Sequence, residues 1–217
     1  MDNTMFKKIK RKILSLEYPK FLKVFIDNVA GYQTVIDLGC GMNKIKGAIG
    51  IDKNFPSSAD IIADIYHLPL RNNQVDLIIA RSVLEHIDDP IAVFKELHTV
   101  LKPGGKFRAY VPHAFGRDAF DDPTHKSFYT LNTVDYFYGK AMKYYIGKIK
   151  FKLSYLRLRI KINPPTNNIH MKIMLELVLF PFNIIIILLG FALPRFFEEF
   201  IKLPFLVGEL YFELVKE

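Results

Sequence analysis

The chain has 217 residues, of which 50% are hydrophobic and 14% aromatic, so it can bury a substantial core and is not intrinsically disordered. A single cysteine excludes an internal disulfide framework. The formal net charge of +8 leaves three interpretations open: a solvated surface, a nucleic-acid partner or an anionic membrane surface. The basic residues near the N-terminus precede no uninterrupted apolar run, which is not typical of a signal peptide.

Residues 1–30 are predicted to form a basic, amphipathic helical segment, because apolar residues recur at helical spacing among the lysines. Residues 31–217 are predicted to form one domain. Two short β-rich runs open this domain and are joined by a loop that contains Gly39 and Gly41. A parallel crossover usually needs about a dozen residues, so this short connection leaves almost no room for a helix.

β-rich runs alternate with helical patterns along the first half of the domain, which implies a mostly parallel α/β sheet. The predicted strands lie at residues 35–38, 48–51, 59–65, 75–80 and 106–112. Helices are predicted at 90–101, where Pro90 starts the pattern, and at 130–142, with Thr130 or Asn132 as N-cap. Two late strands, at 151–162 and 208–217, predict an antiparallel hairpin at the edge of the sheet.

A hydrophobic helical insert is predicted between the two late strands, at about residues 170–204. Residues 173–193 are long enough to cross a bilayer, but Glu176, Pro181 and Asn183 interrupt them. The preferred interpretation is a helical hairpin that lies in the membrane interface, while a buried lid or dimer contact and a true span stay open. We therefore expect peripheral or monotopic membrane contact and a cytoplasmic location at the inner face of the membrane.

The glycine loop is a weak signal for a nucleoside-containing cofactor. Gly39 and Gly41 leave backbone amides open to a ligand, and the carboxylates of Asp37 and Asp52 end the two flanking strands. The third glycine of a dinucleotide-binding fingerprint is replaced by Lys44. A nicotinamide dinucleotide is therefore not expected.

Five segments occur in order along the chain: VIDLGCG, GID, ADIYHLPL, VDLIIARSVLEHI and VLKPGG. Together they resemble the class I S-adenosylmethionine-dependent methyltransferases, in particular the small-molecule, methyltransferase type 11-like group with LDxGCG, LEH and LKPGG motifs. The fragment DPTH is similar to a subgroup with a compressed first loop. The resemblance covers about residues 35–136. It implies a Rossmann-like seven-stranded sheet, S-adenosyl-L-methionine as cofactor and a small-molecule or lipid-linked acceptor.

The resemblance also implies a set of cofactor-binding positions at strand ends: Asp37, Gly39, Gly41, Asp52, Asp64, Ile65 and Arg81. The glycine loop and its preceding acid match the positions that hold the methionine part, and the second acid matches the ribose position. The pair at 64–65 matches the adenine contacts, and Arg81 and Ser82 match positions under the sulfonium. Because the helix after the loop is nearly absent, Lys44 or Lys46 either reaches the cofactor carboxylate or is solvated.

Candidate catalytic groups gather after the fifth strand, at the edge of the sheet where α/β enzymes bind ligands. We expect His125 or His113 to act as general base, with Asp122 fixing the orientation of the imidazole. The alternative is that residues 122–125 form a loop brace in which the aspartate caps backbone amides.

His86 is a further catalytic candidate at the same edge. Glu85 and His86 match part of the acid–x–x–Glu-His group that binds a divalent metal in some quinone O-methyltransferases. Ser82 replaces the first acid of that group, so no metal is expected.

The preferred function is S-adenosylmethionine-dependent O- or N-methylation of a small or lipid-linked acceptor at a membrane surface. An RNA methyltransferase is an alternative because of the net charge, although the sequence after the fourth strand, Ala-Arg-Ser, is not that of enzymes which methylate base amino groups. No DNA partner is expected. A non-catalytic membrane scaffold with a methyltransferase fold is the third possibility.

Overall fold

The computed structural model describes residues 26–139, 149–160 and 207–217. Most of the predicted N-terminal segment, up to residue 25, and the hydrophobic insert at 170–204 lie outside the described residues, so both stay predictions. Within the described ranges, none of the helices combines the length and the apolar character that a membrane span requires.

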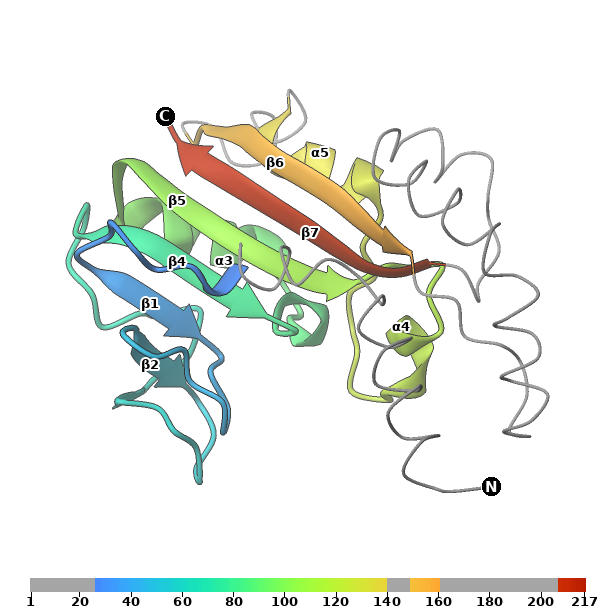
Figure 1. The fold of residues 1–217 in the computed structure, drawn as a ribbon, viewed down its shortest axis with the longest axis horizontal. Helices are drawn as coiled ribbons and strands as arrows, with labels where there is room; N and C mark the ends of the chain where they lie inside the picture. Colours follow the sequence, from blue (N-terminus) through green and yellow to red (C-terminus); the bar gives the residue numbers. More distant parts are fainter. Residues whose placement is uncertain (1–25, 140–148, 161–206) are drawn as a thin grey trace, which may run out of the picture.

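A single seven-stranded sheet forms the centre of the fold, with the strand order β3-β2-β1-β4-β5-β7-β6 (Figure 1). The strands are β1 (Val35–Leu38), β2 (Ile49–Asp52), β3 (Ile61–Ile62), β4 (Val75–Arg81), β5 (Leu101–Pro112), β6 (Phe151–Ile160) and β7 (Val207–Lys216). Strands β1 to β5 pair in parallel, whereas β7 pairs antiparallel with both β5 and β6. The predicted mostly parallel, Rossmann-like sheet with an antiparallel hairpin is confirmed.

Local signals account for the ends of the two longer helices. Helix α3 (Pro90–Val100) starts after Asp89, whose carboxylate accepts the amide N–H of Ala92 at 3.0 Å. Helix α5 (Leu131–Tyr138) starts after Thr130, which forms a reciprocal capping box with Thr133. The prediction of Thr130 as a cap is therefore confirmed. Two short elements, η1 (Leu84–His86) and α4 (Asp118–Asp121), follow β4 and β5.

The two faces of the sheet bury separate apolar clusters, as the alternation of side chains along a strand requires. On one face, Phe94 of α3 stacks on Phe137 of α5 at 3.7 Å between ring centroids and meets Phe107 of β5 edge-on. On the other face, Leu77 and Ile79 of β4 pack with residues from β1 and from the chain before it. Figure 1 shows α3 and α5 on the same side of the sheet. This core holds the strand ends in fixed positions.

The connections next to the predicted site are short. Residues 39–48 form turns and no helix, so the predicted loss of the first crossover helix is confirmed. Strand β3 has two residues, fewer than the predicted 59–65, because the chain turns at Asp64, whose carboxylate accepts the amide N–H of Tyr66. Strand β5 starts at Leu101, earlier than predicted, and the KPGG segment forms an irregularity where the pairing moves from Leu101 to Lys106.

Candidate active site

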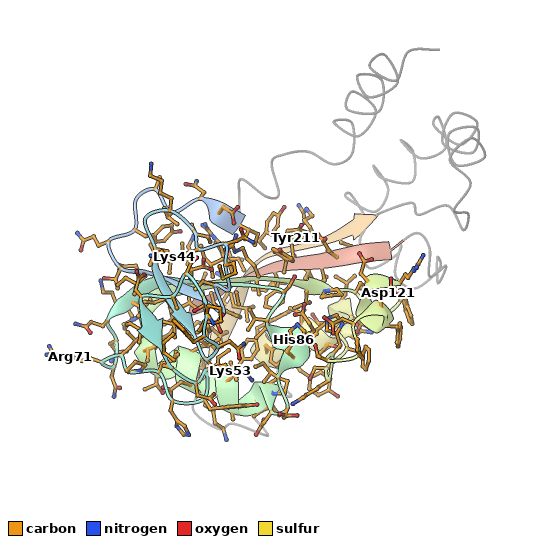
Figure 2. The ribbon with its side chains drawn as sticks, turned by 90° about the horizontal axis from the view of Figure 1, so that it is seen from below. Lys44, Lys53, Arg71, His86, Asp121 and Tyr211 are labelled. Atoms are coloured by element: carbon orange, nitrogen blue, oxygen red, sulfur yellow. The ribbon has the colours of Figure 1, made fainter. Side chains whose placement is uncertain are left out.

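A cavity of about 490 Å³ opens at the carboxyl ends of β1, β2 and β4. Gly39 follows β1 in its wall, Asp52 ends β2, and Ser82 follows β4. Figure 2 labels two further wall residues, Lys53 and His86, on the same side of the ribbon. The volume is typical of small-molecule sites, and this edge is where parallel α/β sheets bind ligands.

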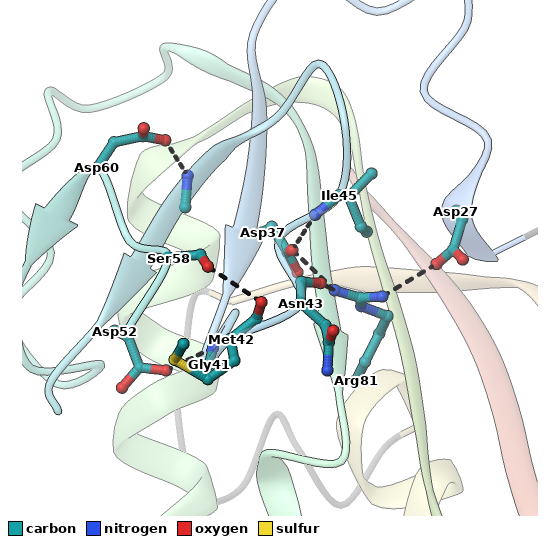
Figure 3. Close-up of polar contacts among 11 residues, drawn as sticks. Asp27, Asp37, Gly41, Met42, Asn43, Ile45, Asp52, Ser58, Asp60 and Arg81 are labelled. Carbon is teal, nitrogen blue, oxygen red and sulfur yellow. Dashed lines mark hydrogen bonds and ion pairs between the residues drawn. The ribbon is translucent and has the colours of Figure 1, made fainter. Parts of the chain in front are cut away.

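Hydrogen bonds join the glycine loop to the end of β2. Gly39 has φ +64° and donates its amide N–H to the carbonyl of Ile51 at 2.7 Å. Gly41 donates its amide N–H to Oδ2 of Asp52 at 2.8 Å (Figure 3). A Cβ on Gly39 would lie 2.4 Å from Cγ2 of Val83, so this position must be glycine for the loop to pack against the residues after β4.

Asp37 and Arg81 form a buried ion pair beside the cavity. The carboxylate of Asp37 accepts the amide N–H of Ile45 at 2.7 Å and a guanidinium N–H of Arg81 at 2.9 Å (Figure 3). Arg81 also faces the carboxylate of Asp27 at 3.7 Å. Burial raises the pKa of Asp37 although both hydrogen bonds oppose the shift. The second carboxylate oxygen, Oδ1, is buried without a hydrogen-bond partner in the described part of the chain.

The two loop lysines differ in their surroundings. The ammonium of Lys44 lies 2.6 Å from Oδ1 of Asp60, and Oδ2 of the same carboxylate accepts the amide N–H of Gly50. Lys46 is exposed. Neither lysine lines the cavity. The structure therefore places Lys44 as a brace between the glycine loop and the segment after β2.

The residues predicted to meet the adenine lie together in the cavity wall. Asp64 is exposed, and its carboxylate accepts the amide N–H of Tyr66 at 3.0 Å. Ile65 is buried beside it. All three residues line the cavity. The turn therefore offers a carboxylate and an apolar surface next to each other.

The three histidine candidates differ in their position relative to the cavity. His86 lines the cavity, whereas His113 and His125 do not. His113 is fully buried, and its Nδ1 accepts the amide N–H of Phe115 at 3.1 Å. The side chain of His125 is 7% exposed, its Nδ1 lies 2.9 Å from the carbonyl oxygen of Ala119, and its ring meets that of His86 edge-on at 4.8 Å.

The loop that contains Asp122 is held against η1 by hydrogen bonds from both main chain and side chains. The amides of Lys126 and Ser127 donate to the carbonyl of Glu85 at 2.7 and 3.0 Å. The hydroxyl of Tyr129 donates to the carbonyl of Leu84 at 3.2 Å. This docking places Thr124 and Lys126 in the wall of the cavity.

Glu85 is buried beneath His86, and neither of its carboxylate oxygens has a hydrogen-bond partner in the described ranges. Burial raises its pKa to about 7. Glu85, His86 and His125 hold ligand-type atoms within 4.8 Å of one another. That no metal is bound here stays a prediction.

The predicted site residues divide into two groups. Those that line the cavity are Gly39, Asp52, Asp64, Ile65 and His86. Those that the structure does not bring to the cavity wall are Asp37, Gly41, Arg81, His113, Asp122 and His125. Within the second group, Asp37, Arg81 and Gly41 make hydrogen bonds that hold the glycine loop. Asp122 and His125 belong to the loop that contacts His86.

Sequence reasoning did not single out several wall residues, among them Lys53, Tyr66, Asp88, Thr124 and Lys126. Lys126 pairs with Asp88 at 2.7 Å at the rim of the cavity, which joins two segments far apart in the sequence. Two of these residues could have been found from their position in the sequence. Lys53 directly follows the strand-end acid Asp52, and Thr124 lies inside the DPTH fragment.

Comparisons with known proteins agree with this architecture. Residues 27–109 match the family model of a methyltransferase domain. That segment contains β1 to β4, most of β5 and almost the whole cavity wall. The structure also resembles that of an S-adenosylmethionine-dependent methyltransferase from Archaeoglobus fulgidus, with a TM-score of 0.53 and 16% sequence identity over 100% of both chains. The fold is therefore that of the S-adenosylmethionine-dependent methyltransferases.

Two curated relatives match by sequence over shorter segments. An uncharacterised 37.1 kDa protein in transposon TN4556 of Streptomyces fradiae is 30% identical over 98 residues, 34% of this chain and 28% of the relative. Cycloartenol-C-24-methyltransferase 1 of Oryza sativa subsp. japonica is 28% identical over 95 residues, 43% of this chain and 26% of the relative. The chain therefore spans less than a third of the length of either protein.

Proposed function

We propose that this protein is an S-adenosyl-L-methionine-dependent methyltransferase. The observation that carries the proposal is the cavity at the ends of β1, β2 and β4, in which Asp52 and Gly39 lie together. The methyltransferase domain match at residues 27–109 and the fold support the same assignment.

The residues present fit this cofactor. Asp52 ends β2 in the cavity wall, and its carboxylate oxygens accept the amide N–H groups of Gly41 and Asn54. We expect the remaining acceptor capacity of this carboxylate to serve the ribose hydroxyls, and Asp64 and Ile65 to offer a polar and an apolar contact to the base. When bound, the cofactor supplies a sulfonium methyl group for in-line transfer. The protein has to align the acceptor, exclude water and remove a proton.

Calorimetry with S-adenosyl-L-methionine and S-adenosyl-L-homocysteine tests this proposal. Asp52→Asn should weaken binding roughly 10- to 100-fold, since a charge-assisted hydrogen bond contributes about 1.5–3 kcal/mol. The matched control is Asp121→Asn, an exposed carboxylate outside the cavity that pairs with Arg117. Absence of binding by the wild-type protein would favour a non-catalytic scaffold. Equal affinity of the Asp52→Asn and wild-type proteins would show that the nucleoside lies elsewhere.

The proposed acceptor is a small or lipid-linked molecule with an apolar part. Phe120 and Phe128 are 67% and 45% exposed and stack on each other at 5.0 Å between centroids. They flank the loop whose Thr124 and Lys126 line the cavity. Exposed apolar surface beside the cavity is compatible with an acceptor that has an apolar part. The net charge of +8 is compatible with an anionic membrane surface and with a cytoplasmic location at its inner face.

A reaction with isotope-labelled cofactor and a lipid extract tests the acceptor class. Label recovered only in the organic phase would support a lipid-linked acceptor. Label in RNA, with salt-sensitive binding, would replace it by the RNA alternative. Membrane association is tested separately by cell fractionation, where recovery of the full chain only in the soluble fraction would contradict the membrane-surface proposal.

A further inference from the structure

We propose that Asp122, Thr124 and His86 form a hydrogen-bonded relay which leaves Nε2 of His86 unprotonated and ready to accept a proton from the methyl acceptor. This inference rests on the proposed methyltransferase function and names the base of that reaction. It also names the acceptor class, a hydroxyl or an amine that loses a proton on methylation.

The first link joins Asp122 and Thr124. Oδ1 of Asp122 accepts the hydroxyl of Thr124 at 2.7 Å and its amide N–H at 2.8 Å. These two hydrogen bonds hold the pKa of Asp122 below its usual value, so the carboxylate is ionised and can only accept. A hydroxyl group carries one hydrogen atom, and Thr124 uses it on the carboxylate.

The second link joins Thr124 and His86. Oγ1 of Thr124 lies 3.0 Å from Nδ1 of His86. Because the only hydroxyl hydrogen is directed at Asp122, Oγ1 has to accept, and Nδ1 of His86 has to be the donor. The carbonyl oxygen of Thr124, which can only accept, lies 3.4 Å from the same Nδ1. Both contacts therefore require the proton on Nδ1.

The tautomer of His86 decides which ring nitrogen can accept a proton. In a neutral imidazole, a proton on Nδ1 places the lone pair on Nε2. Nε2 of His86 has no hydrogen-bond partner within the described ranges, and the residue lines the cavity. Thr124 and Asp122 act as positioning residues, because they hold the His86 ring and its tautomer and do not themselves accept the proton.

A lone pair of the acceptor oxygen or nitrogen forms the new bond to the methyl carbon, and the carbon–sulfur bond breaks with its electron pair on sulfur. The acceptor proton moves to Nε2 of His86. The positive charge of the sulfonium is thereby replaced by that of an imidazolium, whose Nδ1–H stays on Thr124. An acceptor that has no proton to lose would not need this arrangement.

His113 and His125 do not meet these requirements. Neither lines the cavity, and Nδ1 of His113 accepts a backbone amide. His125 contacts His86 through the ring edge, with 4.8 Å between centroids, and thereby limits rotation of that ring. Of these three histidines, His86 is the one that lines the cavity.

The first test is the tautomer of His86 in the full-length, nitrogen-15-labelled protein above neutral pH. Long-range proton–nitrogen correlation spectra distinguish the two neutral forms, and His86→Gln assigns the signal. We expect the proton on Nδ1 in the wild type and in Thr124→Ser, which retains the hydroxyl. In Thr124→Val, which has the same shape without a hydroxyl, we expect loss of this preference. A proton on Nε2 in the wild type overturns the relay even where the variants fail to fold.

The second test is carbethoxylation of histidines, followed by peptide mass spectrometry. S-adenosyl-L-homocysteine should protect His86 and leave His67, an exposed histidine outside the cavity wall, reactive. Equal modification of His86 with and without the nucleoside, when calorimetry shows binding, overturns its placement beside the cofactor. Absence of nucleoside binding overturns the proposed function instead, and the tautomer measurement still decides the relay.

Discussion

The guanidinium of Arg81 lies 2.9 Å from the carboxylate of Asp37, and this ion pair joins the end of β4 to the end of β1. Asp37 is fully buried, whereas the side chain of Arg81 is 18% exposed. The arginine thus compensates a charge that could not otherwise remain ionised in the interior. The pair fixes the geometry of the glycine loop from behind.

Arg81→Met should destabilise the protein because it leaves the Asp37 carboxylate without its counter-charge. We expect a loss of about 3 kcal/mol in the free energy of unfolding, at the lower end for a buried pair because the arginine is partly exposed. Urea unfolding measures it. The control Arg71→Met, an exposed arginine, should change stability by less than about 0.5 kcal/mol. Similar midpoints for the two variants would show that Asp37 is neutral in the folded protein.

Glu85 should make the stability of the protein depend on pH. Its pKa is about 7 in the folded state against an ordinary value of 4.5, so the folded protein retains a proton that the unfolded chain loses. The stability that protonated Glu85 contributes is complete below pH 4.5, the ordinary pKa, and is lost as the pH rises through the folded-state pKa of about 7.

Glu85→Gln, which cannot ionise, isolates this effect. Between about pH 5 and about pH 8, the wild-type free energy of unfolding should fall by about 2–3 kcal/mol more than that of the variant. Urea unfolding at both pH values checks the difference. Parallel pH profiles for the two proteins would mean that the Glu85 carboxyl group has a partner in solution.

Gly39 should tolerate no side chain. In Gly39→Ala the new Cβ combines an unfavourable φ of +64° with a contact of 2.4 Å to Val83, which predicts a loss of about 2–4 kcal/mol. Gly41→Ala is the matched control, since its φ is +51° and no atom lies within 4 Å of its Cβ position. It should lose only about 1–2 kcal/mol.

Thermal or urea unfolding of four proteins separates the two causes: wild type, both single variants and Gly39→Ala combined with Val83→Ala. The double variant should recover the part of the loss that the steric contact causes. If it is no more stable than Gly39→Ala, the backbone conformation alone explains the requirement for glycine.

The sheet could be predicted from the sequence because its signals are local. Strands buried on both faces are continuous apolar runs, and caps such as Thr130 act within one helical turn. The length of β3 could not be predicted, because the chain leaves the sheet where the Asp64 carboxylate bonds to its own backbone. β5 starts at Leu101, before the predicted start at residue 106, because the glycines of the KPGG segment are accommodated inside the strand as an irregularity.

Site residues were predictable where position on a strand end determines their direction, as for Asp52 at the end of β2. They were not predictable where direction depends on a distant partner. Arg81 turns away from the cavity because two aspartates, Asp37 and Asp27, lie on the other side. His113 is buried where its backbone pairs with Tyr129. The role of Thr124 depends on the docking of its loop against η1.

Lys44 stabilises the glycine loop, which has no helix, by contacts on both sides of its side chain. Its ammonium lies on Asp60, and its aliphatic carbons pack against Gly50, where a Cβ would lie 2.7 Å from Cδ of the lysine. Lys44→Met retains the apolar stem and removes the charge. Lys44 lines no part of the cavity. We therefore expect the affinity of the Lys44→Met protein for S-adenosyl-L-homocysteine to stay within about twofold of the wild type, a difference in binding free energy of less than about 0.5 kcal/mol.

Calorimetry of Lys44→Met beside Asp52→Asn checks this expectation, because the second variant should weaken binding strongly in the same assay. Lys46→Met, at an exposed position of the same loop, is the matched control. A loss of about tenfold in Lys44→Met alone would correspond to about 1.4 kcal/mol. It would show that this lysine leaves Asp60 to bind the cofactor carboxylate, and that the ligand, rather than Asp60, determines the position of its ammonium.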